Sequence, residues 1–168
     1  IRRALIDTAV SPDESTAFAP GGIDRLALFT PMVTAVRVAT TAISLLLAAP
    51  KVLGGDAVIT GCAVAIVAYA TLRSIRPIQY SNGIASLNRT LLEALLHVAI
   101  IVATGFWSSP FVFTLLSVVV IAGFARGFAF GLRIAISCSI AISFPAIYLS
   151  GDGPAALKLA GTWSGLLV

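Results

Sequence analysis

Residues 111–149, "FVFTLLSVVVIAGFARGFAFGLRIAISCSIAISFPAIYL", decide the fold. The run is continuously apolar rather than alternating, which favours α-helices over a membrane β-barrel. As one helix, the segment 109–150 would be about 63 Å long, roughly twice the thickness of a bilayer's hydrocarbon core. We therefore predict two membrane helices and a sharp turn at 124–130. The turn is marked by three glycines around Arg126: Gly123, Gly127 and Gly131.

Composition extends this conclusion to the whole chain. Its 168 residues are 58% hydrophobic and 11% charged, with a mean hydropathy of +1.02. Soluble domains carry about 25% charged residues, and a soluble fold of this size could not hide so much apolar surface. The sequence predicts an integral membrane protein whose partner is the lipid bilayer. The net charge of +4 comes from scattered basic residues, so nucleic acid is not expected as a partner.

The apolar runs predict an all-α, polytopic transmembrane bundle. Residues 1–24, rich in Asp, Glu, Pro, Gly and Ser, are expected to form a flexible cytoplasmic tail, and 25–168 the membrane domain. The chain begins at Ile1 and stops inside an apolar run, so we expect it to be part of a longer protein. Six spans are predicted: 31–49, 57–75, 91–107, 111–124, 129–149, and a truncated sixth from about 155 to 168.

Basic residues in the loops predict the orientation. One side of the membrane collects arginines and the other collects Lys51 and Lys158. The arginine side is expected to be cytoplasmic, which places the N-terminus and the segment after residue 168 in the cytoplasm. We also expect three aromatic residues at the outer membrane interface: Trp107, Phe111 and Tyr148. The arginines on the inner side are Arg2, Arg3, Arg25, Arg73, Arg76, Arg89 and Arg126, with Arg133 just inside the following helix.

Polar groups inside the spans are the candidate functional residues. In "TLLEALLHVAII", residues 90–101, Glu93 and the single histidine, His97, share one helix face. Thr90 and Glu93 also fit a capping box, with Thr90 as the helix cap. Arg37 and Arg133 reach a similar depth, where each can simply snorkel to the headgroups. The alternative is one intramembrane polar cluster, formed by Arg37, Glu93, His97 and Arg133.

These groups do not predict catalysis. The chain has no nucleophile elbow, no second histidine and no paired carboxylates, so no catalytic residue, metal site or cofactor is expected in it. Cys62 and Cys138 are interpreted as small core residues rather than a disulfide. A proton-responsive or ligand-holding role for Glu93 and His97 stays open.

The order of features resembles a known family. A cytoplasmic tail leads to an arginine-bearing span, then to "YATLRSIRPIQY" (69–80) and a span with "LLEALLH" (91–97). "ATGFWSSPFVFTLLSVVVIAGFARGFAFGLR" (103–133) follows, and then a last helix heading inward. Over about 22–168 this resembles the N-terminal multi-helix membrane regions of actinobacterial-type sensor histidine kinases. The chain itself holds no kinase motif.

The resemblance implies a two-component signalling protein in a bacterial cell membrane. A dimeric kinase core, often preceded by a GAF domain, would follow the last helix. Phosphotransfer and contact with a response regulator would belong to that missing part. The small-residue spacing of Gly123, Gly127 and Gly131 allows a homodimer as well.

We therefore expect a membrane-embedded sensory and anchor module. The predicted outer loops are short, so stimuli would be lipid-phase, small or mechanical. The alternative is a fragment of a small-molecule transporter or channel. Such proteins usually carry broken helices, repeated halves and polar groups at the bilayer midplane. Here the predicted charges lie in the inner quarter and no repeat is evident.

Overall fold

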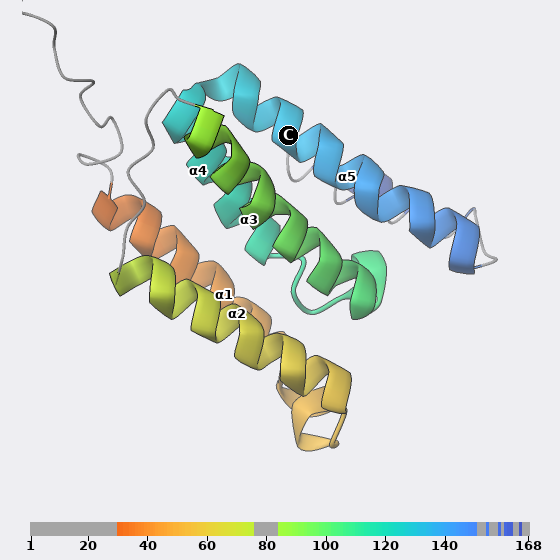
Figure 1. The fold of residues 1–168 in the computed structure, drawn as a ribbon. Helices are drawn as coiled ribbons and strands as arrows, with labels where there is room; N and C mark the ends of the chain where they lie inside the picture. The colour runs from red at the N-terminus through yellow and green to blue at the C-terminus, as the bar shows by residue number, and fades with distance from the viewer. Residues whose placement is uncertain are drawn as a thin grey trace, which may run out of the picture.

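The computed structural model describes residues 30–75 and 84–150, together with residues 154, 158, 160–162 and 165. Every described secondary-structure element is a helix, which confirms the all-α class (Figure 1). The predicted tail, 1–24, lies outside the described residues, as does most of the predicted sixth span. In chain order the elements are α1 (Thr30–Leu53), α2 (Ala57–Ile75), α3 (Ile84–Ala103), the 3-10 helix η1 (Phe106–Ser108), α4 (Thr114–Arg126) and α5 (Phe128–Ser150).

Three described helices are long and apolar enough to cross a membrane: α1, α2 and the Phe128–Leu149 part of α5. Their outward faces carry large apolar side chains, such as Leu46, Val64 and Phe144, which are each more than half exposed. The inward face of α1 carries small and polar ones. A water-soluble bundle has the reverse distribution, whereas lipid-facing helices keep small and polar residues for helix contacts. The chain thus has the build of a multi-pass membrane protein.

The helices α1 and α2 form a tight antiparallel hairpin. Their connection is residues 54–56, with Gly55 in the left-handed region at φ 81°. The Asp56 carboxylate caps α2 by accepting hydrogen bonds from the backbone N–H groups of Val58 (3.0 Å) and Ile59 (3.1 Å). This cap explains why α2 begins at Ala57, where the sequence predicts its start.

Between α3 and α4 the chain folds back into the bundle. Gly105, at φ 117°, turns the chain after α3, and only η1 is helical before α4 begins. Trp107 and Phe111 are almost completely buried here, and Trp107 Nε1 donates to Ser143 Oγ of α5 at 3.0 Å. Irregular backbone is tolerated at membrane depth only where protein surrounds it. The expectation that Trp107 and Phe111 lie at the lipid interface is therefore wrong, while Tyr148 is exposed.

The predicted break between the fourth and fifth spans is confirmed. The helix α4 ends at Arg126, and Gly127 adopts φ 96° and ψ 161° before α5 starts. The returning helix then packs very closely. A Cβ atom placed on Gly131 would lie 2.9 Å from the Cα atom of Gly123, so only glycine fits at 131.

The hairpin α1–α2 lies beside a group made of α3, α4 and α5 (Figure 1). The hairpin meets this group where α1 packs on α4. Within the group, α5 packs on both α3 and α4. We call the end where α1 and α3 begin, and α2 and α4 end, the arginine-rich end. Lys51 lies at the opposite end. This asymmetry agrees with the expected orientation, and the sidedness and the full set of six spans remain predictions. The arginine-rich end holds Arg37, Arg73, Arg89, Arg126 and Arg133.

Candidate functional site

A buried ion pair joins α1 to α3 near the arginine-rich end. Arg37 Nη2 donates to Glu93 Oε1 at 2.7 Å. Arg37 is 8% exposed and Glu93 is 2% exposed, so both charges have lost most of their contact with solvent or headgroups. Arg37 points inward because it shares the buried face of α1 with Thr40 and Ser44. Each charge offsets part of the cost of burying the other.

His97 lies one turn after Glu93 and is buried as well. Its Nδ1 atom is 2.8 Å from the backbone carbonyl oxygen of Glu93. A carbonyl oxygen can only accept, so His97 Nδ1 is the donor in this contact. The His97 ring also meets the ring of Tyr69 from α2 edge-on, with centroids 5.6 Å apart and planes at 81°. This contact joins α2 to α3.

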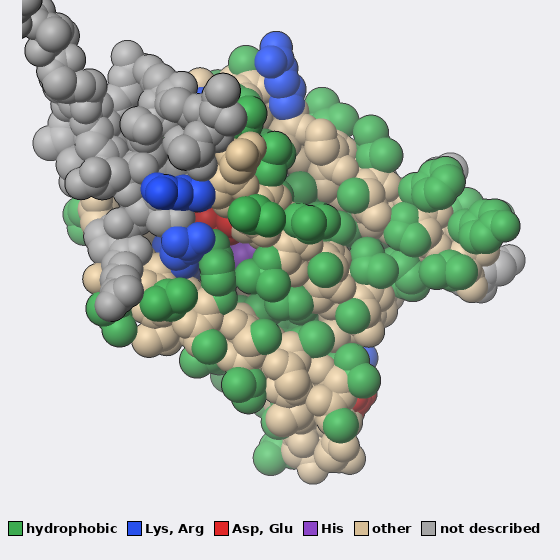
Figure 2. All heavy atoms as spheres, viewed as in Figure 1, with side chains coloured by type: hydrophobic (Ala, Val, Ile, Leu, Met, Phe, Trp, Pro, Cys, Tyr) green, Lys and Arg blue, Asp and Glu red, His purple; other side chains and the backbone are tan. Residues whose placement is uncertain are grey.

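Tyr69 is itself held by Arg73, one turn further along α2. Arg73 Nε donates to Tyr69 Oη at 3.0 Å, and the guanidinium carbon lies 5.1 Å from the ring centroid. Basic side chains gather around an acidic and a histidine side chain on the face drawn in Figure 2. We call five residues, contributed by α1, α2 and α3, the polar cluster. They are Arg37, Tyr69, Arg73, Glu93 and His97.

The sequence prediction missed Tyr69 and Arg73. Tyr69 was noted only within the stretch that carries the family resemblance, and Arg73 was noted there and among the arginines of the inner side. A usable signal was present, because the two side chains are four residues apart near the end of a span. That spacing puts a cation and an aromatic ring on one helix face, at the level of Glu93 and His97 in the neighbouring span.

Two site residues, Thr90 and Arg133, lie in surroundings that differ from those predicted from the sequence. The helix α3 begins at Ile84, so Thr90 lies six residues inside the helix, and its expected role as the helix cap is wrong. Glu93 consequently lies about 13 Å along α3 rather than in its first turn. Arg133 is exposed on α5, and within the described residues no hydrogen bond or ion pair connects it to the polar cluster.

The polar cluster joins three helices through its side chains. It offers one carboxylate, one imidazole, one phenol and two guanidinium groups, and the carboxylate is engaged by a guanidinium. Across the described parts of the chain, no three His, Cys, Asp or Glu side chains converge as a metal site requires. Cys62 and Cys138 are free thiols. The chemistry available is therefore a directional electrostatic contact between helices.

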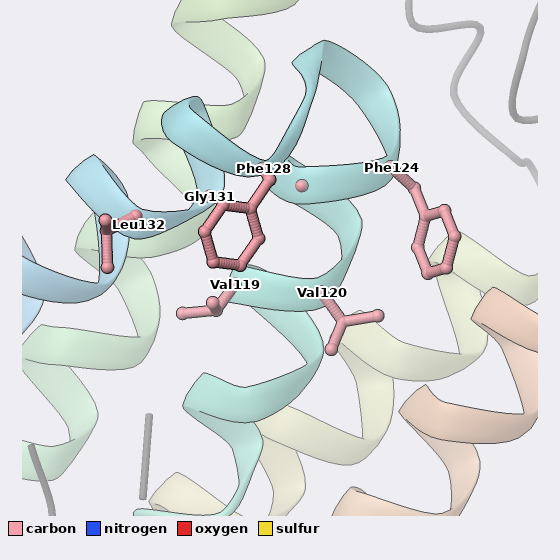
Figure 3. A pocket seen from close by; sticks show the side chains of 7 residues that line it. Val119, Val120, Phe124, Phe128, Gly131 and Leu132 are labelled. Carbon is pink, nitrogen blue, oxygen red and sulfur yellow. The ribbon is translucent and has the colours of Figure 1, made fainter. Parts of the chain in front are cut away.

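A second feature is an apolar groove between α4 and α5, next to the turn that joins them (Figure 3). Its volume is about 340 Å³. No charged residue lines it, so it offers only apolar contact. The lining residues are Val119, Val120, Gly123, Phe124, Phe128, Gly131 and Leu132.

Comparison of the chain with models of protein families, with curated proteins and with solved structures finds no match. The function therefore has to be argued from the bundle and its polar cluster.

Proposed function

We propose that the chain is the membrane-embedded sensory and anchor module of a signalling protein. It would pass a change in helix packing to a cytoplasmic output domain, which the family resemblance suggests is a histidine kinase. The observation that carries the proposal is the buried Arg37–Glu93 ion pair, which ties α1 to α3 inside the bundle.

Buried charges inside a membrane bundle are costly and usually have a functional reason. A structural role alone could be met by well-packed apolar side chains, which often give equal or greater stability than a buried ion pair. An ion pair differs from such packing because it is directional and can be made or broken by a small helix shift. Sensory bundles work through shifts of about 1–2 Å at helix interfaces.

The helix connections support a stimulus that acts on the bundle itself. Residues 54–56 form a three-residue turn, and the segment between α3 and α4 is packed into the protein. Neither of these two connections has room for a folded receptor domain. A lipid-phase, small or mechanical stimulus would reach the polar cluster by altering how α1 and α2 lie against α3.

A transporter or channel is the second candidate, because the polar face of α1 continues beyond Arg37. Thr40 and Ser44 are both buried, and among the described residues Ser44 Oγ has no hydrogen-bond partner. Polar groups deeper in a bundle are typical of transport pathways. This reading predicts that solute flux, rather than output activity, depends on Glu93.

The test uses the full-length protein in proteoliposomes. Glu93→Gln and His97→Ala are each expected to change the rate of ATP-dependent autophosphorylation severalfold, with membrane insertion and expression unchanged. Arg133→Gln is the matched control, because it removes a charge at the same end outside the polar cluster, and it should leave the rate unchanged. Unaltered autophosphorylation in both cluster variants would refute the sensory proposal. Loss of a solute flux in Glu93→Gln would favour the transporter.

A further inference from the structure

We propose that the α1–α2 hairpin is a movable unit, and that the polar cluster is the latch that holds its arginine-rich end against α3. The proposal deepens the proposed function by naming the part that moves. The role of the motion in signalling rests on the proposed function, whereas the motion itself is argued from the bundle alone.

The hairpin is built to move as one body. Its two helices are joined by only three residues. The backbone N–H of Asp56 donates to the Lys51 carbonyl of α1 at 3.1 Å, and the Asp56 carboxylate accepts the two hydrogen bonds that cap α2. The helices α1 and α2 then pack against each other. A short, capped connection leaves little freedom within the hairpin, so a displacement of α1 carries α2 with it.

The seam between α1 and α4 is poor in hydrogen bonds among the described residues. The inward face of α1 beyond Arg37 consists of small side chains: Thr40, Ser44 and Ala48. Thr40 Oγ1 donates to carbonyl groups of its own helix, at 2.9 and 3.1 Å, and Ser44 Oγ is buried with no hydrogen-bond partner in the described part of the chain. These hydroxyls therefore add no hydrogen bond across the seam.

The group α3–α5 has two kinds of contact that the seam between α1 and α4 lacks among the described residues. Backbone meets backbone at Gly123 and Gly131, and Trp107 bonds to Ser143 between the α3–α4 connection and α5. The hairpin itself contributes buried Ile59 and Ile66 of α2 to the shared apolar core. Apolar contacts are non-directional, so they can act as a pivot on which the hairpin turns.

Two directional contacts then hold the arginine-rich end closed. They are the Arg37–Glu93 ion pair and the edge-on contact of Tyr69 with His97. Both reach from the hairpin to α3, and Glu93 and His97 are only one turn apart. A displacement of a few Å would break both together, which gives the hairpin a closed and an open position.

The experiment measures three distances by double electron–electron resonance in the full chain. The background carries Cys62→Ala and Cys138→Ala, and spin labels occupy exposed positions near the arginine-rich end. Leu72 and Leu92 report across the α2–α3 seam. Val38 and Leu72 report within the hairpin, and Leu92 and Ile136 report within α3–α5.

Glu93→Gln should lengthen the Leu72–Leu92 distance by several Å or broaden its distribution, and leave the other two distances unchanged. Arg133→Gln should change none of them. Exchanging the charges, with Arg37→Glu and Glu93→Arg together, should restore the original distance. An unchanged Leu72–Leu92 distance in Glu93→Gln would overturn the proposal. A change in all three distances would overturn it as well, because it would mean general loosening.

Tyr69→Ala provides a second variant in case Glu93→Gln does not fold. It breaks the other latch contact and leaves the Arg37–Glu93 ion pair in place, although it also removes the Tyr69 partner of Arg73. It should lengthen the same distance. The outcome is separable from the proposed function. A lengthened distance with unchanged autophosphorylation would support the latch and refute the sensory role. Changed autophosphorylation with an unchanged distance would support the sensory role and refute the latch.

Discussion

Replacing Arg37 by glutamine is expected to destabilise the bundle by about 3 kcal/mol, at the lower end of the range of about 3–5 kcal/mol for breaking a buried ion pair. At a separation of 2.7 Å and an effective dielectric constant of about 20, the gross attraction is about 6 kcal/mol. Lost hydration offsets part of this attraction. The penalty arises because Glu93, 2% exposed, stays buried without the Arg37 charge, and the lower end applies because the side-chain amide of glutamine still supplies a hydrogen-bond donor at position 37.

The assay is reversible unfolding in mixed micelles at increasing mole fractions of dodecyl sulfate, followed by circular dichroism. Arg133→Gln is the control, and as an exposed substitution it should change the free energy of unfolding by about 0.5 kcal/mol or less. A double-mutant cycle with Glu93→Gln should show strong coupling, with the double variant losing less than the sum of the single losses. If Arg37→Gln is no worse than Arg133→Gln, or if the two cluster substitutions are additive, the ion pair does not contribute to stability as argued.

Three further outcomes are expected. Gly131→Ala should lower the free energy of unfolding by about 1–3 kcal/mol, because its Cβ atom would lie 2.9 Å from Gly123 Cα. Gly123→Ala is the control and should lower the free energy of unfolding little, since its Cβ atom meets nothing within 4 Å. Equal effects of the two substitutions would contradict the close packing. Trp107→Phe removes the 3.0 Å hydrogen bond to Ser143 Oγ and should lower the free energy of unfolding by about 1 kcal/mol. An unchanged free energy of unfolding would show that this hydrogen bond is not formed in the membrane. A reporter fused after Asp56 should report the outside of the cell, and a cytoplasmic signal would reverse the proposed orientation.

The sequence predicted the helices best where the local chemistry was unambiguous. The span predicted for α2 from its apolar run, 57–75, has the bounds of the helix, and the break at Gly127 follows from glycines in an overlong apolar run. The start of α3 was misplaced because the Thr90–Glu93 spacing imitates a capping box. A helix can extend beyond the hydrocarbon core through polar residues, so the apolar boundary does not fix its first residue.

The candidate site was only partly predictable, because depth in a span does not determine the direction of a side chain. Arg37 and Arg133 were placed at a similar depth, yet Arg37 shares a face with Thr40 and is buried, whereas Arg133 is exposed. Trp107 was misplaced for a related reason. Its segment folds back into the bundle, and that fold depends on contacts with α5 that are distant in sequence.

The separation of Arg37 and Glu93 along the chain has a consequence for biogenesis. Glu93 follows Arg37 by 56 residues, which at about 5–20 residues per second takes about 3–11 s to synthesise. During that interval α1 enters the membrane with an arginine whose counter-ion does not yet exist. Because Arg37 is only seven residues from the start of α1, its side chain can reach the headgroups until α3 arrives. The first helix is thus inserted in one electrostatic state and completed in another, with α3 supplying the charge that lets the arginine turn inward.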